Sequence, residues 1–334
     1  MPDAIVLPRD TQLSLAQDAA RSPSAHNVQP ARWRFEPNGD VILFRELGRE
    51  LPIGDPTAHD LQASLGAAYE GLSLALSRFD MRLTNLRIEL VARASGCVPV
   101  VRAHLAAGAT RDPLAEFVRS RRSYRGTFVP ATSDTSALVE GLAGDDAIAV
   151  TLPAAIATIA SLHESATWHF ESQRDYHAEL WSWLRLDRHD PRYLRDGLNA
   201  DCLALSNAER IGARVAMRPG VFAVLSTLGI ARYLVSERAQ VKSAAGLLLF
   251  APLASANAFD AGRGFYRLWL EMTRAGLHAA PMSASADHAP TRDTIAHAHN
   301  VPSNRRLANV LRVGRAPAGA VAESPRLPES ELLV

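Results

Sequence analysis

The chain has 334 residues, of which 47% are hydrophobic and 21% charged, and that length fits about two domains of roughly 150 residues each. Because 36 Lys and Arg face 35 Asp and Glu, the net charge of +1 gives no bulk attraction for nucleic acid or an anionic membrane. No apolar run reaches the roughly 20 residues of a membrane span, and Cys97 and Cys202 lie too far apart to suggest a disulfide framework or a metal cluster. The sequence begins with acids and prolines, so we expect a cytoplasmic protein.

The first half predicts a helix and a loop, then a β-hairpin, a long helix and further strands. The Asn38-Gly39 pair between two alternating segments is a strong hairpin signal. Asp55 and Pro56 form a helix start before an apolar period of three and four residues. The expected elements are a helix at 11–20, a loop at 21–30, strands at 33–36 and 41–45, a helix through 61–79, strands at 87–92 and 98–105, and a helix restarting at 112.

The second half predicts a similar plan. Strands are expected at 147–152, 246–251 and 308–313, a helix at 261–275 closed by Gly276, and an extended tail at 315–334. The segments 60–81 and 262–282 share a helix-then-turn design about 200 residues apart, which favours an internal duplication. We therefore divide the chain into a first lobe, 1–110, and a second lobe, 111–334. Residues 176–243 are too long and too apolar for a plain linker.

The loop 21–30 is the first candidate site. Its sequence, RSPSAHNVQP, combines proline-fixed backbone, small hydroxyls and two amide side chains. Such a loop suits a planar heterocycle, because small residues allow close approach and amides both donate and accept hydrogen bonds. A polar connection between lobes has the same composition, so both interpretations stay open.

The segment 119–125 is the second candidate. In an extended chain, Arg121, Ser123 and Arg125 point the same way. Two guanidiniums beside a hydroxyl suit a phosphate or an anionic ring. A solvated basic run is the alternative.

Together these segments resemble the nitroreductase-like FMN-binding family. That family carries an R-x-S-x-R segment, matched by Arg121, Ser123 and Arg125. Its P-S-x-x-N-x-Q-P-W segment is matched by Pro23, Ser24, Asn27, Gln29 and Pro30, with Trp33 displaced by two places. Its G-L-x-x-x-P turn is matched at 276–281 and its terminal basic residue by Arg326.

The distribution of the motifs resembles the two-lobe Acg-type subgroup. The first lobe lacks R-x-S-x-R and the second lacks P-S-x-x-N, so only one complete site can be assembled. The resemblance implies an α+β fold of two tandem nitroreductase-like lobes, a pseudo-dimer in which each lobe is a mostly antiparallel sheet packed by helices. It also implies that one FMN lies between the lobes, that a monomer suffices for the site, and that residues 176–243 form a lid inserted in the second lobe.

The resemblance also implies residue roles. Arg121, Ser123 and Arg326 would hold the phosphate, and Arg125 would face N1 and O2 of the flavin. Pro23, Ser24, Asn27 and Gln29 belong to the segment that lines the ring. Met282 and Ser283 would bring backbone groups near N5, although many relatives have Glu-Gly where this chain has Ser283-Ala284.

The expected function is an FMN-dependent oxidoreductase that takes hydride from NAD(P)H and passes electrons to a nitro-aromatic, a quinone or a similar acceptor. Neither half-reaction needs a side-chain acid or base at N5, so no catalytic residue is predicted. The alternatives are an FMN storage protein closed by its lid and an enzyme for one small, enclosed substrate. His288, His297 and His299 lack partners at ligand spacing, so we predict no metal site. We also predict no nucleic-acid or membrane partner.

Overall fold

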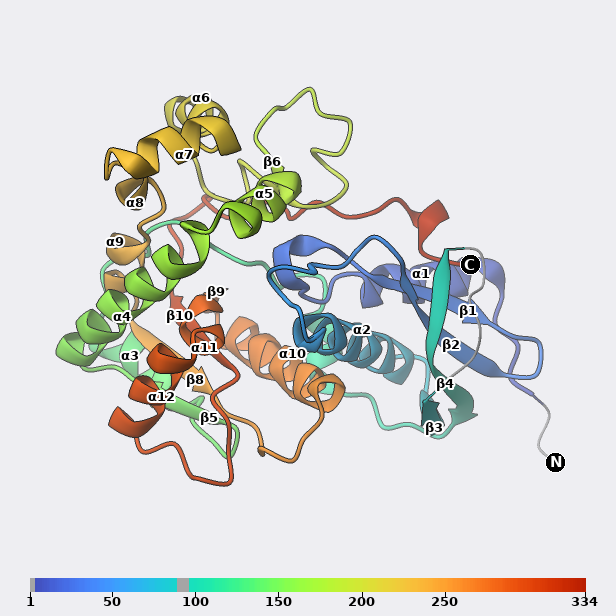
Figure 1. Ribbon diagram of the computed structural model, residues 1–334. Coiled ribbons are helices and arrows are strands. Elements are labelled where there is room, and N and C mark those ends of the chain that lie inside the picture. Colours follow the sequence, from blue (N-terminus) through green and yellow to red (C-terminus); the bar gives the residue numbers. More distant parts are fainter. Residues whose placement is uncertain (1–3, 89–95) are drawn as a thin grey trace.

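The computed structural model describes residues 4–88 and 96–334 and is an α+β structure with two antiparallel four-stranded sheets (Figure 1). The first contains β1 (Ala31–Phe35), β2 (Asp40–Glu46), β3 (Met81–Ile88) and β4 (Cys97–Ala107). The second contains β5 (Ala147–Val150), β8 (Gly246–Phe250), β9 (His278–Pro281) and β10 (Asn309–Gly314). A short parallel pair joins β6 (Leu184–Arg185) and β7 (Leu198–Asn199). The α+β fold with antiparallel sheets, expected from the sequence, is confirmed.

Helices and single turns surround these sheets. The helices are α1 (Arg9–Ala19), α2 (His59–Ser77), α3 (Ser133–Glu140), α4 (Pro153–Glu171), α5 (Arg174–Trp183), α6 (Asn207–Ala216), α7 (Pro219–Thr227), α8 (Ala231–Leu234), α9 (Arg238–Lys242), α10 (Ala258–Arg274), α11 (Ala284–Asp287) and α12 (Ala289–Ala298). Short 3₁₀ turns lie at Ala25–Asn27, Pro113–Glu116 and Glu329–Glu331.

The two sheets have the same strand order. Neighbouring strands run β1-β2-β4-β3 in the first and β5-β8-β10-β9 in the second. Along the chain, a long helix connects the second strand of each sheet to the third. This helix is α2 between β2 and β3, and α10 between β8 and β9. Asp80 and Gly276 follow these helices with φ of 56° and 71°, so the chain turns into the third strand at matching places.

Both sheets are buried on both faces of a central strand. The first packs one face against α1 and α2, where Leu15, Leu65 and Leu72 meet Trp33 and Leu43, and on the other face of β2 a smaller cluster buries Ile42 and Phe44. In the second sheet, successive residues of β8 alternate between two cores. Both faces of β8 are therefore covered, which explains its uninterrupted apolar sequence.

Several sequence predictions need correction. The hairpin at Asn38-Gly39 and the left-handed Gly276 are confirmed. The strand expected at 87–92 instead begins at Met81, because the chain reverses at Asp80; positions 89–92 lie outside the described residues. The helix expected from 112 is a single 3₁₀ turn, capped where the Asp112 carboxylate accepts a hydrogen bond from the Leu114 amide at 2.9 Å.

The C-terminal tail returns to the first sheet. The Trp33 amide donates to the Leu332 carbonyl at 2.9 Å, and Leu327 and Leu332 join the first core. Figure 1 accordingly places the C-terminus beside β1 and β2. The tail therefore links the part of the molecule that contains the second sheet, the second half, to the part that contains the first sheet, the first half.

Candidate functional site

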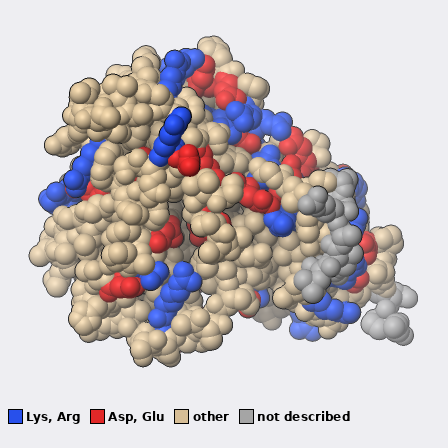
Figure 2. Space-filling model, in the orientation of Figure 1, with Lys and Arg blue, Asp and Glu red and all other residues tan. Residues whose placement is uncertain are grey.

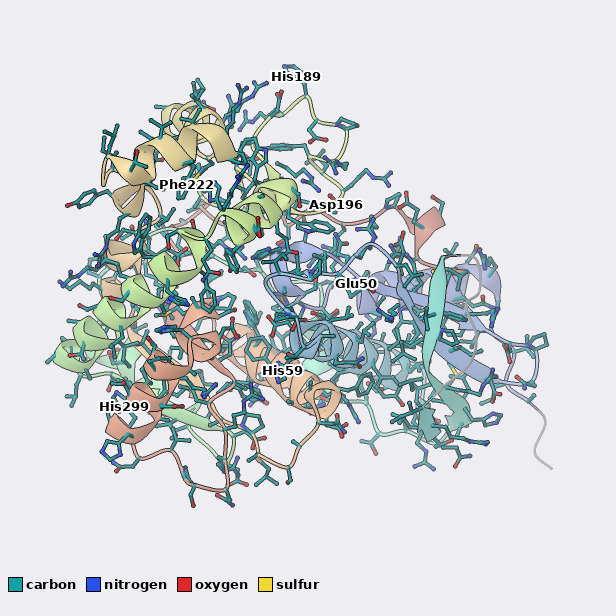
Figure 3. The ribbon with its side chains drawn as sticks, in the orientation of Figure 1. Glu50, His59, His189, Asp196, Phe222 and His299 are labelled. Atoms are coloured by element: carbon teal, nitrogen blue, oxygen red, sulfur yellow. The ribbon has the colours of Figure 1, made fainter. Side chains whose placement is uncertain are left out.

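One large cavity, of about 460 Å³, lies between the two halves. Residues of α2 and α10 line it together with α4 and residues 176–240, and His59 at the start of α2 is labelled in Figure 3. Eight of the ten predicted site residues line this cavity: Pro23, Ser24, Asn27, Arg121, Ser123, Arg125, Ser283 and Arg326. Gln29 and Met282 are not among its lining residues.

Arg121 is a buried guanidinium that faces the cavity, with 2% of the residue exposed. Arg121 ends a turn, in which its amide donates to the Phe117 carbonyl at 3.0 Å, and Ser123 beyond it forms a parallel bridge with Ala279. The Nη2 atom of Arg121 donates to the Arg21 carbonyl at 2.8 Å and the guanidinium lies 4.8 Å from the centre of the Trp269 ring, while Nε and Nη1 have no hydrogen-bond partner. Burial lowers the pKa of Arg121 to about 10, because desolvation disfavours the charged form. Two buried donors thus lack an acceptor.

Arg326 reaches the same place from the C-terminal tail. Its Nη2 donates to the Arg21 carbonyl at 3.2 Å and its Nη1 to Asn27 Oδ1 at 2.9 Å, whereas Nε has no partner. Burial, and next the charge of Arg121, lower the pKa of Arg326 to about 9. An anion between the two guanidiniums would relieve both the repulsion and the missing hydrogen bonds.

Arg125 is the third cation of the cavity. Its guanidinium makes no hydrogen bond or ion pair within the part of the chain that the structure describes. His26 also lines the cavity, and burial followed by the Arg125 charge lowers its pKa to about 4. His26 is therefore neutral at physiological pH and adds no positive charge to that of Arg125.

The loop 21–30 is held in an unusual conformation. His26, Asn27 and Gln29 have φ of 44°, 56° and 52°, in the left-handed region that most side chains avoid. Asn27 Nδ2 donates to the carbonyls of Gly197 at 3.1 Å and Pro325 at 3.0 Å. Asn27 thus ties the loop to the tail and to residues 176–243.

The two predicted residues outside the cavity have other partners. The Gln29 side chain accepts from the Leu327 amide at 3.0 Å and donates to the Arg195 carbonyl at 2.8 Å. Met282 is 1% exposed and packs in the second core, and its amide donates to Val310 at 2.7 Å. Both residues hold lining segments in place instead of facing the cavity themselves.

A wall of polar residues was missed by the sequence analysis. His163, Thr167 and Glu171 line the cavity from α4 at spacings of four, which place them on one face of the helix. Burial, and next the charge of Glu237, raise the pKa of Glu171 to about 8. This regular spacing within 153–171 is the signal that could have identified them.

Asp287 is a further ionisable residue of this wall, and His163 makes hydrogen bonds within it. Burial, and next the charge of Asp60, raise the pKa of Asp287 to about 7. His163 lies 2.9 Å from Ser285 Oγ through Nδ1 and 3.3 Å from Glu237 Oε2 through Nε2. The cavity is therefore lined both by arginines and by carboxyl groups.

Residues 176–243, which we term the cover, supply part of the cavity lining. They are bonded to residues of the first half that precede α2. Asp196 accepts from Arg185 at 2.7 Å and forms an ion pair with Arg49 at 3.3 Å; Figure 3 labels Asp196. Among the aromatic residues of this segment, Tyr176 lines the cavity, whereas Trp181, Trp183 and Tyr193 do not. The cover thus contributes mainly aliphatic side chains.

No group of three His, Cys, Asp or Glu residues suited to a metal occurs in the described ranges 4–88 and 96–334. Within these ranges no helix is long and apolar enough to span a bilayer.

Comparison with known proteins gives distant similarities. No family model matches the chain. It is 26% identical over 336 residues to the uncharacterized protein Rv3127 of Mycobacterium tuberculosis strain H37Rv, covering 94% of this chain and 90% of that one. The uncharacterized protein MT3212 of strain CDC 1551 matches equally well.

Two solved structures are similar at lower identity. The FMN-dependent nitroreductase NfnB of Mycobacterium smegmatis, in complex with NADPH, is 21% identical over 65% of this chain and 96% of that one, with a TM-score of 0.37. A nitroreductase of Bacteroides fragilis with bound FMN is 13% identical over 67% and 98%, with a TM-score of 0.36.

Proposed function

We propose that the protein is an FMN-dependent oxidoreductase of the nitroreductase type, with its flavin in the cavity between the two halves. The observation that carries this proposal is the pair formed by the buried Arg121 and the half-buried Arg326, whose Nε atoms are buried without a hydrogen-bond partner and whose guanidiniums share one carbonyl acceptor. A phosphate fits such a pair, since it supplies both the negative charge and several acceptor oxygens. The matching family motifs support the same assignment.

The remaining lining residues fit the rest of a flavin. Pro23, Ser24 and Asn27 would line the ring from the first half, and Arg125 would face its pyrimidine edge. A cation there stabilises the negative charge of a reduced ring and so tunes the reduction potential. Ser283 lines the same cavity, and the backbone of Met282 and Ser283 would lie near N5 of the flavin.

When bound, FMN would supply the chemistry of accepting a hydride from NAD(P)H and passing electrons to a nitro-aromatic, a quinone or a similar acceptor. The protein's own contribution is to bind, orient and shield. Arg121 and Arg326 would hold the phosphate where they meet at the Arg21 carbonyl, and residues 176–240 would limit the access of water. No side-chain acid or base is assigned a catalytic role.

We further propose that the two halves are fused nitroreductase-like lobes, as in the Acg-type subgroup. The identical strand order of the two sheets supports this, as does the crossing of α2 and α10. The first lobe would supply the loop 21–30 and the second lobe the segment 121–125, so one monomer would bind one FMN. Light scattering combined with flavin absorbance tests this: FMN found only in a dimer would contradict it.

The main experiment follows the flavin absorbance near 450 nm under anaerobic conditions before and after NADH or NADPH is added. Rapid bleaching, with recovery on adding a nitro-aromatic or a quinone, is the expected result. A purified protein that cannot be loaded with FMN would overturn the proposal.

A second candidate is a protein that stores FMN with little or no turnover. The ion pair between Arg49 and Asp196 favours this storage function, because it holds the cover against the first half beside the cavity. In that case the flavin stays oxidised with NADH and NADPH but bleaches with dithionite. An enzyme for one small, enclosed substrate would instead bleach with pyridine nucleotide and reject bulky acceptors.

A further inference from the structure

Large apolar side chains are exposed along one short stretch of the cover, from α6 to α8. Tyr233 is 81% exposed, Leu228 65% and Val224 58%. Scattered apolar residues are normal on protein surfaces, but a concentration of them marks an interaction site. The outer lid face is defined by the exposed residues Ile211, Val215, Val221, Val224, Leu228, Ile230 and Tyr233.

Other side chains attach these helices to the rest of the protein. Phe222 of α7, labelled in Figure 3, is 3% exposed and stacks on His177 with ring centroids 3.6 Å apart. Ala231 of α8 is fully buried, while Ala213 and Met217 line the cavity from the inner side. The inner side of this segment therefore packs against the rest of the protein, whereas the outer lid face is exposed to solvent.

The charge around the outer lid face is positive. Residues 210–236 contain four arginines and no Asp or Glu. Arg214 pairs with Asp187, and Arg210 lies near the Leu186 carbonyl. Arg218 and Arg232 have no ion-pair partner among the residues that the structure describes.

The two acids that flank residues 210–236 in the sequence have other partners. Glu209 caps α6 through the Ser206 amide at 2.8 Å, and Glu237 bonds His163 on the cavity side. In Figure 2, the outer corner of the molecule around α7 and α8 is mainly tan. Positive charge at the rim of an apolar surface is the pattern of helices that lie on anionic membranes.

We propose that the outer lid face docks on an anionic lipid bilayer. Val224, Leu228 and Tyr233 would enter the interfacial region, where apolar and aromatic side chains are stabilised, and Arg218 and Arg232 would meet the lipid headgroups. A second copy of the chain fits less well, because a symmetric contact would bring the same arginines together. This proposal goes beyond the oxidoreductase function and departs from the expectation, drawn from net charge, of no membrane partner.

The test is cosedimentation of the full FMN-loaded chain with vesicles. The expected result is binding to phosphatidylglycerol–phosphatidylcholine vesicles that weakens in high salt, with much weaker binding to phosphatidylcholine alone. The double variant Leu228→Asp/Tyr233→Asp should lower the partition coefficient at least tenfold. Arg218→Glu/Arg232→Glu should abolish the preference for anionic vesicles.

Leu152→Asp is the matched control, because Leu152 is 72% exposed but lies outside the cover. Circular dichroism and FMN content show whether each variant is folded. The proposal is overturned if the wild type stays in the supernatant with anionic vesicles, or if Leu152→Asp loses as much binding as the double variant. A wild-type dimer that dissociates in Leu228→Asp, with no vesicle binding, would assign the face to a second copy instead.

Discussion

Gly66 of α2 and Gly262 of α10 are reciprocal contact points between two helices that cross at the centre of the molecule. A Cβ on Gly66 would collide with the Phe259 carbonyl, and a Cβ on Gly262 with the Ala63 carbonyl. Each glycine thus faces the residue three positions before the other glycine. The helix backbones approach closely because neither position carries a side chain.

Replacing either glycine should therefore destabilise the protein. We expect Gly66→Ala and Gly262→Ala each to lower the free energy of unfolding by about 1–3 kcal/mol, since the obstructing atoms are backbone and cannot rotate away. Urea denaturation measures this. Gly212→Ala is the control, because no atom lies within 4 Å of its Cβ position in α6. It should be neutral or slightly stabilising.

Arg121→Ala should weaken FMN binding at least tenfold. The variant removes a guanidinium whose unpartnered donors face the cavity, and a charge-assisted hydrogen bond contributes about 1.5–3 kcal/mol. Quenching of flavin fluorescence gives the dissociation constant. The neighbour Arg122 pairs with Glu323 at 2.8 Å, so Arg122→Ala should bind FMN nearly normally. Equal losses in both variants would argue against a phosphate at Arg121.

Arg125→Ala should lower the flavin reduction potential or weaken FMN retention, because it removes a cation from the pyrimidine edge proposed above. Arg125→Lys should recover part of the effect, since the charge remains while the planar fork of donors is lost. A redox titration against reference dyes measures the potential. Unchanged potential and unchanged flavin content in Arg125→Ala would contradict its placement.

Glu171→Gln should change the dependence of stability on pH. The folded pKa of about 8 lies above the ordinary 4.5, so the folded protein binds the extra proton. The free energy of unfolding of the wild type should therefore fall as the pH rises from about 5 to about 8. The variant should lose about 1–2 kcal/mol less over this range. Urea melts at pH 5 and pH 8 give the difference.

A surface carboxylate provides the comparison for Glu171. Glu116 has a side chain that is 60% exposed, so Glu116→Gln removes a carboxylate outside the cavity. A change in slope as large as that of Glu171→Gln would show that the effect is not specific to position 171. Asp287, with a pKa raised to about 7, is present in every variant, so its contribution cancels in the difference. A Glu171→Gln variant with the wild-type slope would show that the carboxyl titrates normally.

Local patterns in the sequence determined the elements whose stability is local. Asn38-Gly39 specifies a hairpin because its residues adopt the required turn, and Gly276 specifies a helix end for the same reason. The alternation of Arg121, Ser123 and Arg125 likewise indicated three side chains on one side of an extended segment, and all three line the cavity.

Only the tertiary structure decided which distant groups meet. Gln29 belongs to a motif but turns away to the tail, and Glu171 belongs to no motif yet lies in the cavity wall. The pKa of Glu171 depends on burial by segments far along the chain, which no local pattern encodes. The exposed apolar residues of α6 to α8 resemble core residues in sequence, because hydrophobicity alone does not say which side of a helix another segment will cover.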